Sequence, residues 1–142
     1  MILNLEKQDI SRLLEEAAQA FPAECCGLLI GSGKDQIMVT AVVPTANLSD
    51  DPGRFLIDPQ CQFDWLRKLR GTEHRIVGHY HSHPNGLDRP SSHDEQMAAD
   101  SEQIWVIIPV KDGVSGEPKG YRLKGANLGF EGIPIVEVAS PY

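Results

Sequence analysis

The chain carries an alternating run of three histidines, Gly78-His79-Tyr80-His81-Ser82-His83-Pro84, and soon after it a second polar run, Ser91-Ser92-His93-Asp94. The first run belongs to a segment, Arg75–His83, that we expect to form a β-strand. Side chains alternate across a strand, so His81 and His83 point to the same side, one pleat repeat apart. Two imidazoles at that separation can converge on one cation.

A metal site of this kind needs a further ligand from another segment. Asp94 lies beyond a short loop, at the expected start of a helix, and would complete a set of two imidazole nitrogens and one carboxylate oxygen. Such a set leaves a fourth position for water, as catalytic zinc sites do. No cysteine belongs to this cluster, which disfavours an iron–sulfur or four-cysteine site.

The same residues also have a purely structural interpretation. Ser91-x-x-Asp94 fits a capping box, and Ser92-x-x-Glu95 fits a second box one residue later, so one of the two boxes could account for the helix start without Asp94. Three alternating histidines are harder to explain structurally, because burying neighbouring imidazoles without partners costs free energy. We therefore predict metal binding.

Helical periodicity predicts three helices around this stretch. The first runs from Asp9 to Phe21 and ends before Pro22. The second begins at Asp58-Pro59, with Asp58 as N-cap, and is closed by Gly71. Its inner face is expected to carry Cys61, Trp65, Leu66 and Leu69. A third, short helix opens at Ser91 or Ser92 and reaches Met97–Ala99.

Apolar and β-branched runs predict the strands between these helices. Loops are expected at Pro44–Gly53, Pro84–Pro90 and Lys111–Lys119. The expected strands are Met1–Leu5, Cys25–Ile30, Ile37–Val43, Arg54–Ile57, Arg75–His83, Ile104–Val110, Tyr121–Leu123 and Ile133–Val138. Because strands and helices interleave, we expect an α/β (α+β) fold with a central mixed sheet.

Composition narrows the class of protein. The 142 residues fit one domain, 1–142, and the net charge of −7 supplies no basic patch for nucleic acid. Three cysteines, two of them adjacent, disfavour a disulfide framework and favour a reducing cytosol. No signal peptide or membrane-spanning run is expected, so we predict a cytoplasmic protein.

A water-activating site also needs a general base. Glu24 is the candidate, since it lies between the first helix and the apolar strand Cys25–Ile30. From its position alone, a solvent-exposed loop carboxylate is the commoner outcome. Cys25 and Cys26 are expected to be small core residues and not nucleophiles.

Two stretches together resemble the JAMM (MPN+) metallopeptidases: Pro22-Ala23-Glu24-Cys25-Cys26-Gly27-Leu28-Leu29-Ile30-Gly31 and His81-Ser82-His83 through Asp94. That family's signature is an upstream Glu, then His-x-His, ten residues and Asp; here the ten residues run from Pro84 to His93. Phe55 with Asp58-Pro59 is similar to the family's middle segment. The resemblance extends from the first helix to about Leu123. It implies the JAMM/MPN (cytidine-deaminase-like) fold, with a curved mixed sheet flanked by helices.

The resemblance also implies a mechanism. His81, His83 and Asp94 would bind zinc, and Glu24 would take a proton from the zinc water and pass it to the leaving amine. Ser91 would donate a hydrogen bond to the developing oxyanion. The family pattern places no ligand at His79, which is expected to line the site, and assigns no role to His93.

The family cleaves peptide or isopeptide bonds at the C-terminus of ubiquitin-like proteins. Compact bacterial and archaeal members resemble enzymes that trim sulfur-carrier proteins, so the expected partner is a ubiquitin-like protein ending in Gly-Gly, and neither nucleic acid nor membrane. Two alternatives stay open: a non-catalytic MPN scaffold, although scaffolds characteristically lack the ligands, and a zinc peptidase acting on small peptides. Nucleotide deaminases are set aside because their signature needs Pro-Cys-x-x-Cys, which the chain lacks.

Overall fold

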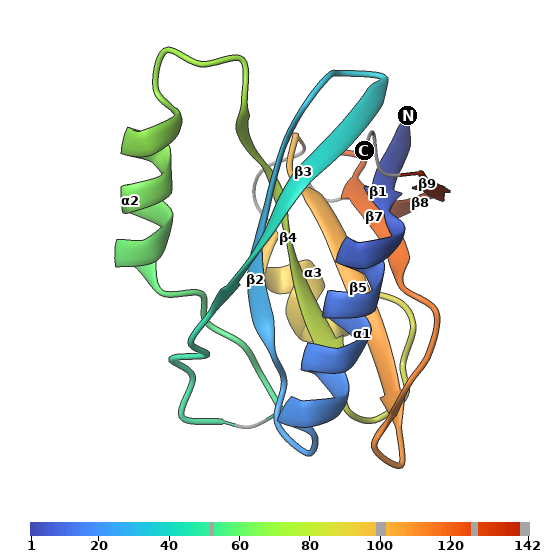
Figure 1. The fold of residues 1–142 in the computed structure, drawn as a ribbon. Helices are drawn as coiled ribbons and strands as arrows, with labels where there is room; N and C mark the ends of the chain where they lie inside the picture. Colours follow the sequence, from blue (N-terminus) through green and yellow to red (C-terminus); the bar gives the residue numbers. More distant parts are fainter. Residues whose placement is uncertain (52, 99–101, 126–127, 140–142) are drawn as a thin grey trace.

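A computed structural model describes residues 1–51, 53–98, 102–125 and 128–139 (Figure 1). The helices are α1 (Lys7–Ala20), α2 (Pro59–Leu69) and α3 (Ser92–Met97). The strands are β1 (Ile2–Glu6), β2 (Cys26–Ser32), β3 (Gln36–Thr45), β4 (Arg75–His83), β5 (Ile104–Lys111), β6 (Val114–Ser115), β7 (Lys119–Leu123), β8 (Phe130–Ile133) and β9 (Ile135–Val138). They form one sheet in the order β8-β7-β5-β4-β2-β3-β1-β9, with β6 paired to β5.

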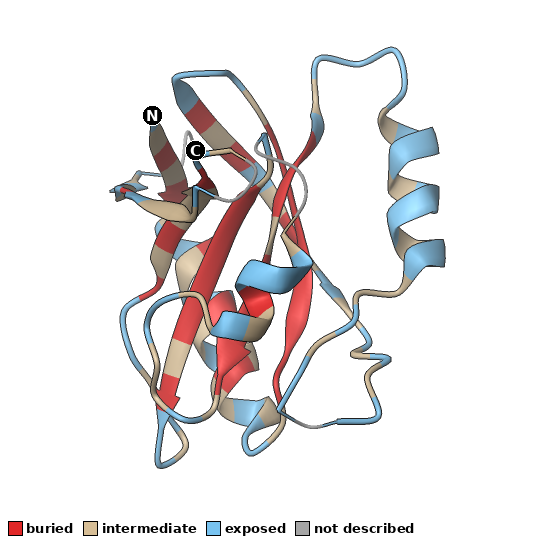
Figure 2. Cartoon of the chain, turned by 180° about the vertical axis from the view of Figure 1, so that it is seen from behind, coloured by how far each residue is buried: buried red, intermediate tan, exposed pale blue. Residues whose placement is uncertain are grey.

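The sheet is mixed, as the sequence predicts. β2 is antiparallel to both β3 and β4, whereas β4 and β5 run parallel. The central strands β2, β4 and β5 are buried along most of their length (Figure 2). Burial on both faces explains why β2 and β5 are continuous apolar runs without alternation.

Helices cover both faces of this sheet. α1 packs Leu13 and Ala17 against the main core, which includes Leu29 of β2. α2 belongs to a second, smaller cluster with Leu28 and Ile30 of the same strand. Because Leu28 and Leu29 are consecutive strand residues, the two clusters lie on opposite faces. α3 lies on the face away from α1, as the two views show (Figures 1 and 2).

β4 contains one extra residue relative to β2. Gly78 lies opposite Leu29 and Ile76 lies opposite Ile30, so Val77 is unmatched. Val77 and Tyr80 both belong to the core on the α1 side, although residues three positions apart in a regular strand point to opposite faces. A bulge of this kind changes which way the following side chains point. His79, and with it His81 and His83, therefore faces away from α1.

One expected strand is wrong: residues Arg54–Ile57 form only an isolated bridge, between Asn47 and Ile57. The side chain of Asn47 replaces a strand partner there. Its Nδ2 donates to the Arg54 carbonyl at 2.9 Å and its Oδ1 accepts from the Leu56 amide at 3.0 Å. The segment is thus held by this side chain and by a backbone bond from the Leu48 amide to the Leu56 carbonyl at 2.9 Å, and not by a continuous ladder.

Several boundaries also differ from the expectation. Ile133–Val138 is two strands, because Pro134 has no amide hydrogen to continue a ladder. α1 begins at Lys7, two residues before Asp9, and the expected turn at Lys111–Lys119 contains β6 and the start of β7. On α2, Leu66 is exposed, whereas Cys61, Trp65 and Leu69 pack inward. Ala99, the outer expected limit of α3, lies outside the described residues.

The helices of the described residues include none that is both long enough and apolar enough to cross a membrane.

Candidate metal centre

Three side chains converge at the C-terminal end of β4. The Nε2 atoms of His81 and His83 lie 3.0 Å apart, and each is close to Oδ2 of Asp94, at 3.2 and 3.0 Å respectively. All three residues are buried. The alternation of β4 brings the imidazoles to one side, and α3 brings the carboxylate to them, as the sequence predicts.

The tautomer of His83 is fixed by the loop that follows β4. Its Nδ1 lies 3.0 Å from the carbonyl oxygen of Leu87. A carbonyl can only accept, so Nδ1 carries a hydrogen, and in the neutral ring Nε2 is then the nitrogen with the lone pair that a metal can bind. This backbone contact is the type of outer interaction that orients metal-ligating histidines.

The His81 ring packs against two aromatic rings, and its buried Nδ1 makes no hydrogen bond among the described residues. Phe55 stacks on the ring with centroids 4.1 Å apart and planes inclined by 17°. Trp105 meets the same ring edge-on, at 5.8 Å. These contacts fix the orientation of the imidazole plane.

Asp94 takes part in the cap of α3 as well as in this cluster. Ser91 Oγ accepts from the Asp94 amide at 3.0 Å, and Asp94 Oδ2 accepts from the Ser91 amide at 2.8 Å. The capping box is therefore the first of the two possible boxes. The oxygen that closes it is the one that faces both imidazoles, so the structural and metal-binding interpretations are compatible.

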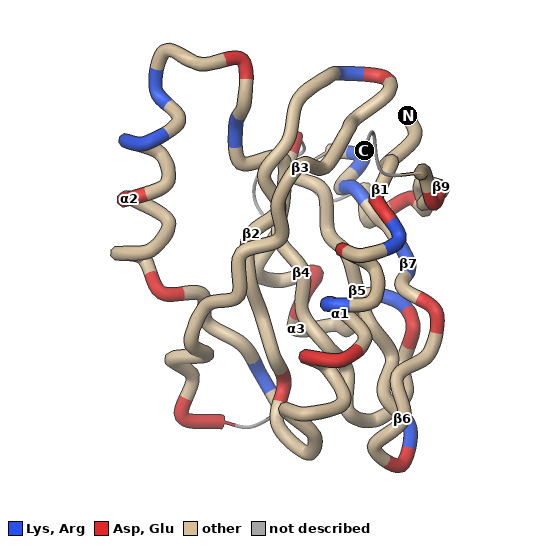
Figure 3. Tube along the Cα trace, viewed as in Figure 1, with Lys and Arg blue, Asp and Glu red and all other residues tan. Residues whose placement is uncertain are grey.

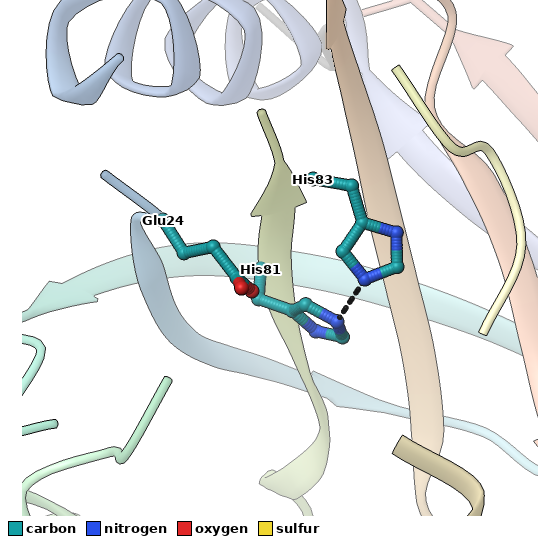
Figure 4. A group of neighbouring side chains, drawn as sticks. All are labelled: Glu24, His81 and His83. Atoms are coloured by element: carbon teal, nitrogen blue, oxygen red, sulfur yellow. Dashed lines mark hydrogen bonds between the residues drawn. The ribbon is translucent and has the colours of Figure 1, made fainter. Parts of the chain in front are cut away.

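Glu24 lies at the same place and is buried, contrary to the expectation from position alone. Ser82 Oγ accepts from the Cys25 amide at 2.9 Å, and the Ser82 amide donates to the Cys25 carbonyl at 3.1 Å. These two bonds tie the residue after Glu24 to β4. Glu24, His81 and His83 each offer a ligand atom, and these atoms lie within 4.8 Å of one another (Figure 4).

Comparison with known proteins agrees with this geometry. The family model described as prokaryotic homologs of the JAB domain matches residues 6–123. The chain belongs to this family. The JAB domain is also similar to the desampylase of Haloferax volcanii, with 33% identity over 69% of this chain and 70% of that protein. It is 24% identical to the CysO-cysteine peptidase of Mycobacterium tuberculosis, over 96% of this chain and 92% of the peptidase.

Solved structures show the same fold. A Desulfitobacterium hafniense protein, solved in solution, superposes with a TM-score of 0.84 at 30% identity, over 99% of this chain and 94% of that one. A JAB1/MPN domain protein of Archaeoglobus fulgidus gives 0.59 at 22% identity, over 96% of this chain and 100% of that one. The predicted JAMM/MPN fold and family are therefore confirmed.

The two carboxyl groups of this JAB domain sit in opposite electrostatic environments. Burial, together with the charges of Asp94 and Asp51, raises the pKa of Glu24 to about 8. Burial acts on Asp94 too, but hydrogen bonds from His81 and His83 outweigh it and hold the pKa of Asp94 far below its usual range. A pair of acids separated in this way has one member suited to carry a proton and one that stays ionised.

His79 stays outside the converging group. Its ring lies 6.1 Å from that of His81 and packs edge-on against Trp105 at 4.4 Å. Burial, with the neighbouring His81, lowers the pKa of His79 to about 3, so the ring is neutral. Cys25 and Cys26 are buried and free, which confirms them as core residues.

A pocket of about 130 Å³ opens beside the cluster. Glu24, Ser91 and Asp94 line one part of it, and Arg54 and Asn85 line another. His93, which the sequence leaves without a role, also lines this pocket. Several of the candidate residues thus face a common pocket.

The donor set suits a zinc ion. Two neutral imidazole nitrogens and an ionised carboxylate oxygen are the ligands of a catalytic zinc site, and Glu24 or Asp94 can supply the oxygen. Among the described residues His81 Nδ1 is buried without a hydrogen-bond partner, so the polar contacts that can order this ring are those at its Nε2.

Sequence patterns missed three residues that build this centre. Asn47 donates to the Glu24 carbonyl at 3.0 Å and so anchors the general-base candidate. Ser82 and the Leu87 carbonyl support Glu24 and His83 through bonds described above. Only Ser82 had a sequence signal, because it is a small polar residue between two histidines. The contacts of Asn47 and of the Leu87 carbonyl depend on loop conformation, which the sequence pattern does not give.

Proposed function

We propose that this JAB domain is a zinc-dependent metallopeptidase. It hydrolyses a peptide or isopeptide bond at the C-terminus of a ubiquitin-like protein of the sulfur-carrier type. The observation that carries the proposal is the convergence of His81 Nε2, His83 Nε2 and Asp94 Oδ2 within 3.2 Å of one another, in a buried cluster that Glu24 faces.

Two carboxylates compete for the role of third ligand, and the geometry favours Asp94. Its Oδ2 lies close to both imidazole nitrogens and is oriented by the Ser91 amide. A carboxylate fixed by a backbone N–H keeps its remaining lone pair aimed at the metal position. Glu24 is then left free to carry protons.

The reaction follows from these assignments. Zinc, when bound, supplies a Lewis acid and lowers the pKa of water. The Glu24 carboxylate accepts a proton from the attacking water and delivers it to the amine that leaves as the C–N bond breaks. The Ser91 hydroxyl oxygen accepts from the Asp94 amide, so its own hydrogen is available to the carbonyl oxygen that gains charge.

The pocket and the relatives support the substrate class. A pocket of about 130 Å³ beside the cluster has room for an extended Gly-Gly tail, whose residues carry no side chains. The similar proteins named desampylase and CysO-cysteine peptidase are hydrolases of this general kind. The same reasoning makes a Gly-Gly-terminated sulfur-carrier protein the partner.

Replacing Glu24 tests the proposal. Glu24→Gln should retain zinc and fold but lose cleavage by orders of magnitude, because the amide cannot accept the water's proton. The substrate is a sulfur-carrier protein extended at its C-terminus by one amino acid, and release is followed by mass spectrometry. Zinc per chain is measured on the same samples.

Glu15→Gln, an exposed acid on α1, is the matched control and should cleave normally. His81→Ala/His83→Ala should lose both zinc and activity. Undiminished cleavage by Glu24→Gln would remove Glu24 from the mechanism. A zinc-free, inactive wild-type protein after expression with ample zinc would favour the scaffold alternative.

A further inference from the structure

A second, larger pocket lies at the other end of the sheet. It has a volume of about 520 Å³ and is lined by the β2–β3 turn, the start of β4 and the end of β7. Arg75 begins β4, whereas His81 and His83 end it, so this pocket and the candidate metal centre lie at opposite ends of one strand. Register brings the segments together, since Arg75 lies opposite Gly31 and Arg122 opposite Ile104.

The pocket concentrates positive charge in an acidic protein. Lys34, Arg75, Arg122 and Lys124 line it, and Glu102 is the acidic residue that does so. These four are drawn from only thirteen basic residues in a chain with a net charge of −7. Figure 3 shows basic positions in the β2–β3 turn and at the start of β4, at the end of the sheet where the pocket lies.

The four cations are only partly engaged. Arg122 pairs with Glu131, and Arg75 donates through one nitrogen to the Gly33 carbonyl at 2.6 Å. Lys34 and Lys124 make no ion pair with any acid among the described residues. Glu102 in the lining and Glu131 beside Arg122 offset part of this charge, and the remaining excess of positive charge favours a ligand of opposite charge.

The wall behind these cations is apolar. Ile37, Ile76 and Leu123 line the same cavity and are buried. An apolar wall with a few convergent charged groups is the usual composition of a small-molecule site, and the volume lies in the usual range for one. A flat protein or nucleic-acid surface would not need this concavity.

We propose that this pocket binds a small phosphate-bearing metabolite, with the phosphate held by Lys34, Arg75 and Lys124 and an apolar ring against Ile37, Ile76 and Leu123. Arginine and lysine together match the charge and the several acceptor oxygens of a phosphate group. The site is independent of zinc and of the peptidase activity.

An NMR titration of the zinc-loaded, full-length protein tests this proposal at physiological ionic strength, where exposed charges are screened. The probes are AMP, inorganic phosphate and uncharged adenosine. AMP should bind saturably with a Kd of about 1 mM or tighter. Its amide shifts should cluster at residues 33–37, 75–76 and 122–124 and leave Glu24 and His83 unchanged. Inorganic phosphate should bind the same residues more weakly, and adenosine should not bind.

Lys34→Ala/Lys124→Ala should weaken AMP binding roughly tenfold, through the loss of two charge-assisted contacts. Lys7→Ala/Lys111→Ala removes the same charge elsewhere and should leave the affinity within about twofold. The proposal is overturned if neither AMP nor phosphate gives saturable shifts in this pocket. It is also overturned if the shifts map to the metal centre or if both double variants weaken binding equally.

Discussion

At the candidate metal centre, one carboxylate oxygen of Asp94 performs two tasks. It accepts from the Ser91 amide and so completes the capping box of α3, and it also approaches both imidazole nitrogens. A carboxylate oxygen has lone pairs enough for both. Under the proposed assignment, the oxygen that caps α3 would also bind the metal, so substitutions here should change stability and metal binding to different extents.

Ser91 allows the two tasks to be separated. Ser91→Ala removes the hydroxyl that caps the Asp94 amide and should cost about 1 kcal/mol of unfolding free energy. It should keep zinc, because Asp94 and both histidines stay in place. Turnover should fall about 100-fold through loss of the hydrogen bond to the carbonyl oxygen. Ser92→Ala, one residue later, is the control; an equal loss of rate in both variants would refute a special role for Ser91.

Phe55 is the second residue whose role can be isolated. His81 Nδ1 has no partner among the described residues, and the stacked Phe55 ring, at 4.1 Å, packs closer to the imidazole than Trp105, at 5.8 Å. Phe55→Leu should weaken zinc affinity by roughly threefold to tenfold, the scale of an aromatic contact. Competition with a chromogenic chelator measures this. Phe63→Leu on the exposed side of α2 should have no effect, and unchanged affinity in Phe55→Leu would contradict the assignment.

At the level of elements, β4 is the scaffold of the site. Tyr80 points toward α1, where its hydroxyl donates to Glu16 Oε2 at 2.6 Å, while His81 and His83 point to the opposite face, where the candidate metal centre lies. Gly27 on β2 leaves room for that ring, since a Cβ there would lie 2.4 Å from Tyr80 Oη. β4 thus contributes Tyr80 to the core on one face of the sheet and His81 and His83 to the candidate metal centre on the other.

The contact between α1 and β4 predicts a pH-dependent stability. Burial raises the pKa of Glu16, with the Tyr80 hydrogen bond opposing it. A raised pKa means that the folded state binds this proton more tightly than the unfolded state. The Glu16 contribution to stability is therefore most favourable at acid pH and is lost as the pH rises through the folded-state pKa.

Glu16→Gln removes this titration while keeping an acceptor for Tyr80. The variant should be more stable than the wild type at pH 7, and the difference should shrink toward pH 4, where the native carboxyl is protonated. Urea unfolding of the metal-free proteins at both pH values measures this. Glu15→Gln on the exposed side of α1 is the control. A stability difference that grows on acidification would show that the sign is wrong.

Much at this level was predictable from sequence, for physical reasons. Alternation along β4 placed His81 and His83 together, and Asp58-Pro59 marked the start of α2, since both effects are local. The loop of residues 46–58 was not predictable, because Asn47 supplies hydrogen bonds to residues seven and nine positions away. The bulge at Val77 was not predictable either, because it arises from the pairing of β4 with β2 and leaves no pattern in the local sequence.

At the scale of the whole molecule, the candidate centre joins segments that are far apart in sequence. Glu24 precedes β2, the two histidines end β4 and Asp94 lies on α3. β2 and β4 are neighbours in the sheet, so that part of the centre is preformed by the core. α3 has six residues, too few for a stable helix alone, and depends on its connection to β4.

Zinc should therefore stabilise α3 more than it stabilises the sheet. Removing zinc with a chelator should lower the unfolding free energy by about 4 kcal/mol relative to protein with free zinc a thousandfold above its Kd, because the ion binds the folded state alone. In hydrogen exchange, amides of residues 91–98 should lose protection, while those of β2 and β5 stay protected by the core. The Glu24→Gln variant, which keeps all three ligands, should show the same zinc-dependent protection, and Asp94→Ala should show none. If residues 91–98 exchange at the same rate with and without zinc, Asp94 does not connect α3 to the metal, and the ligand must instead be Glu24.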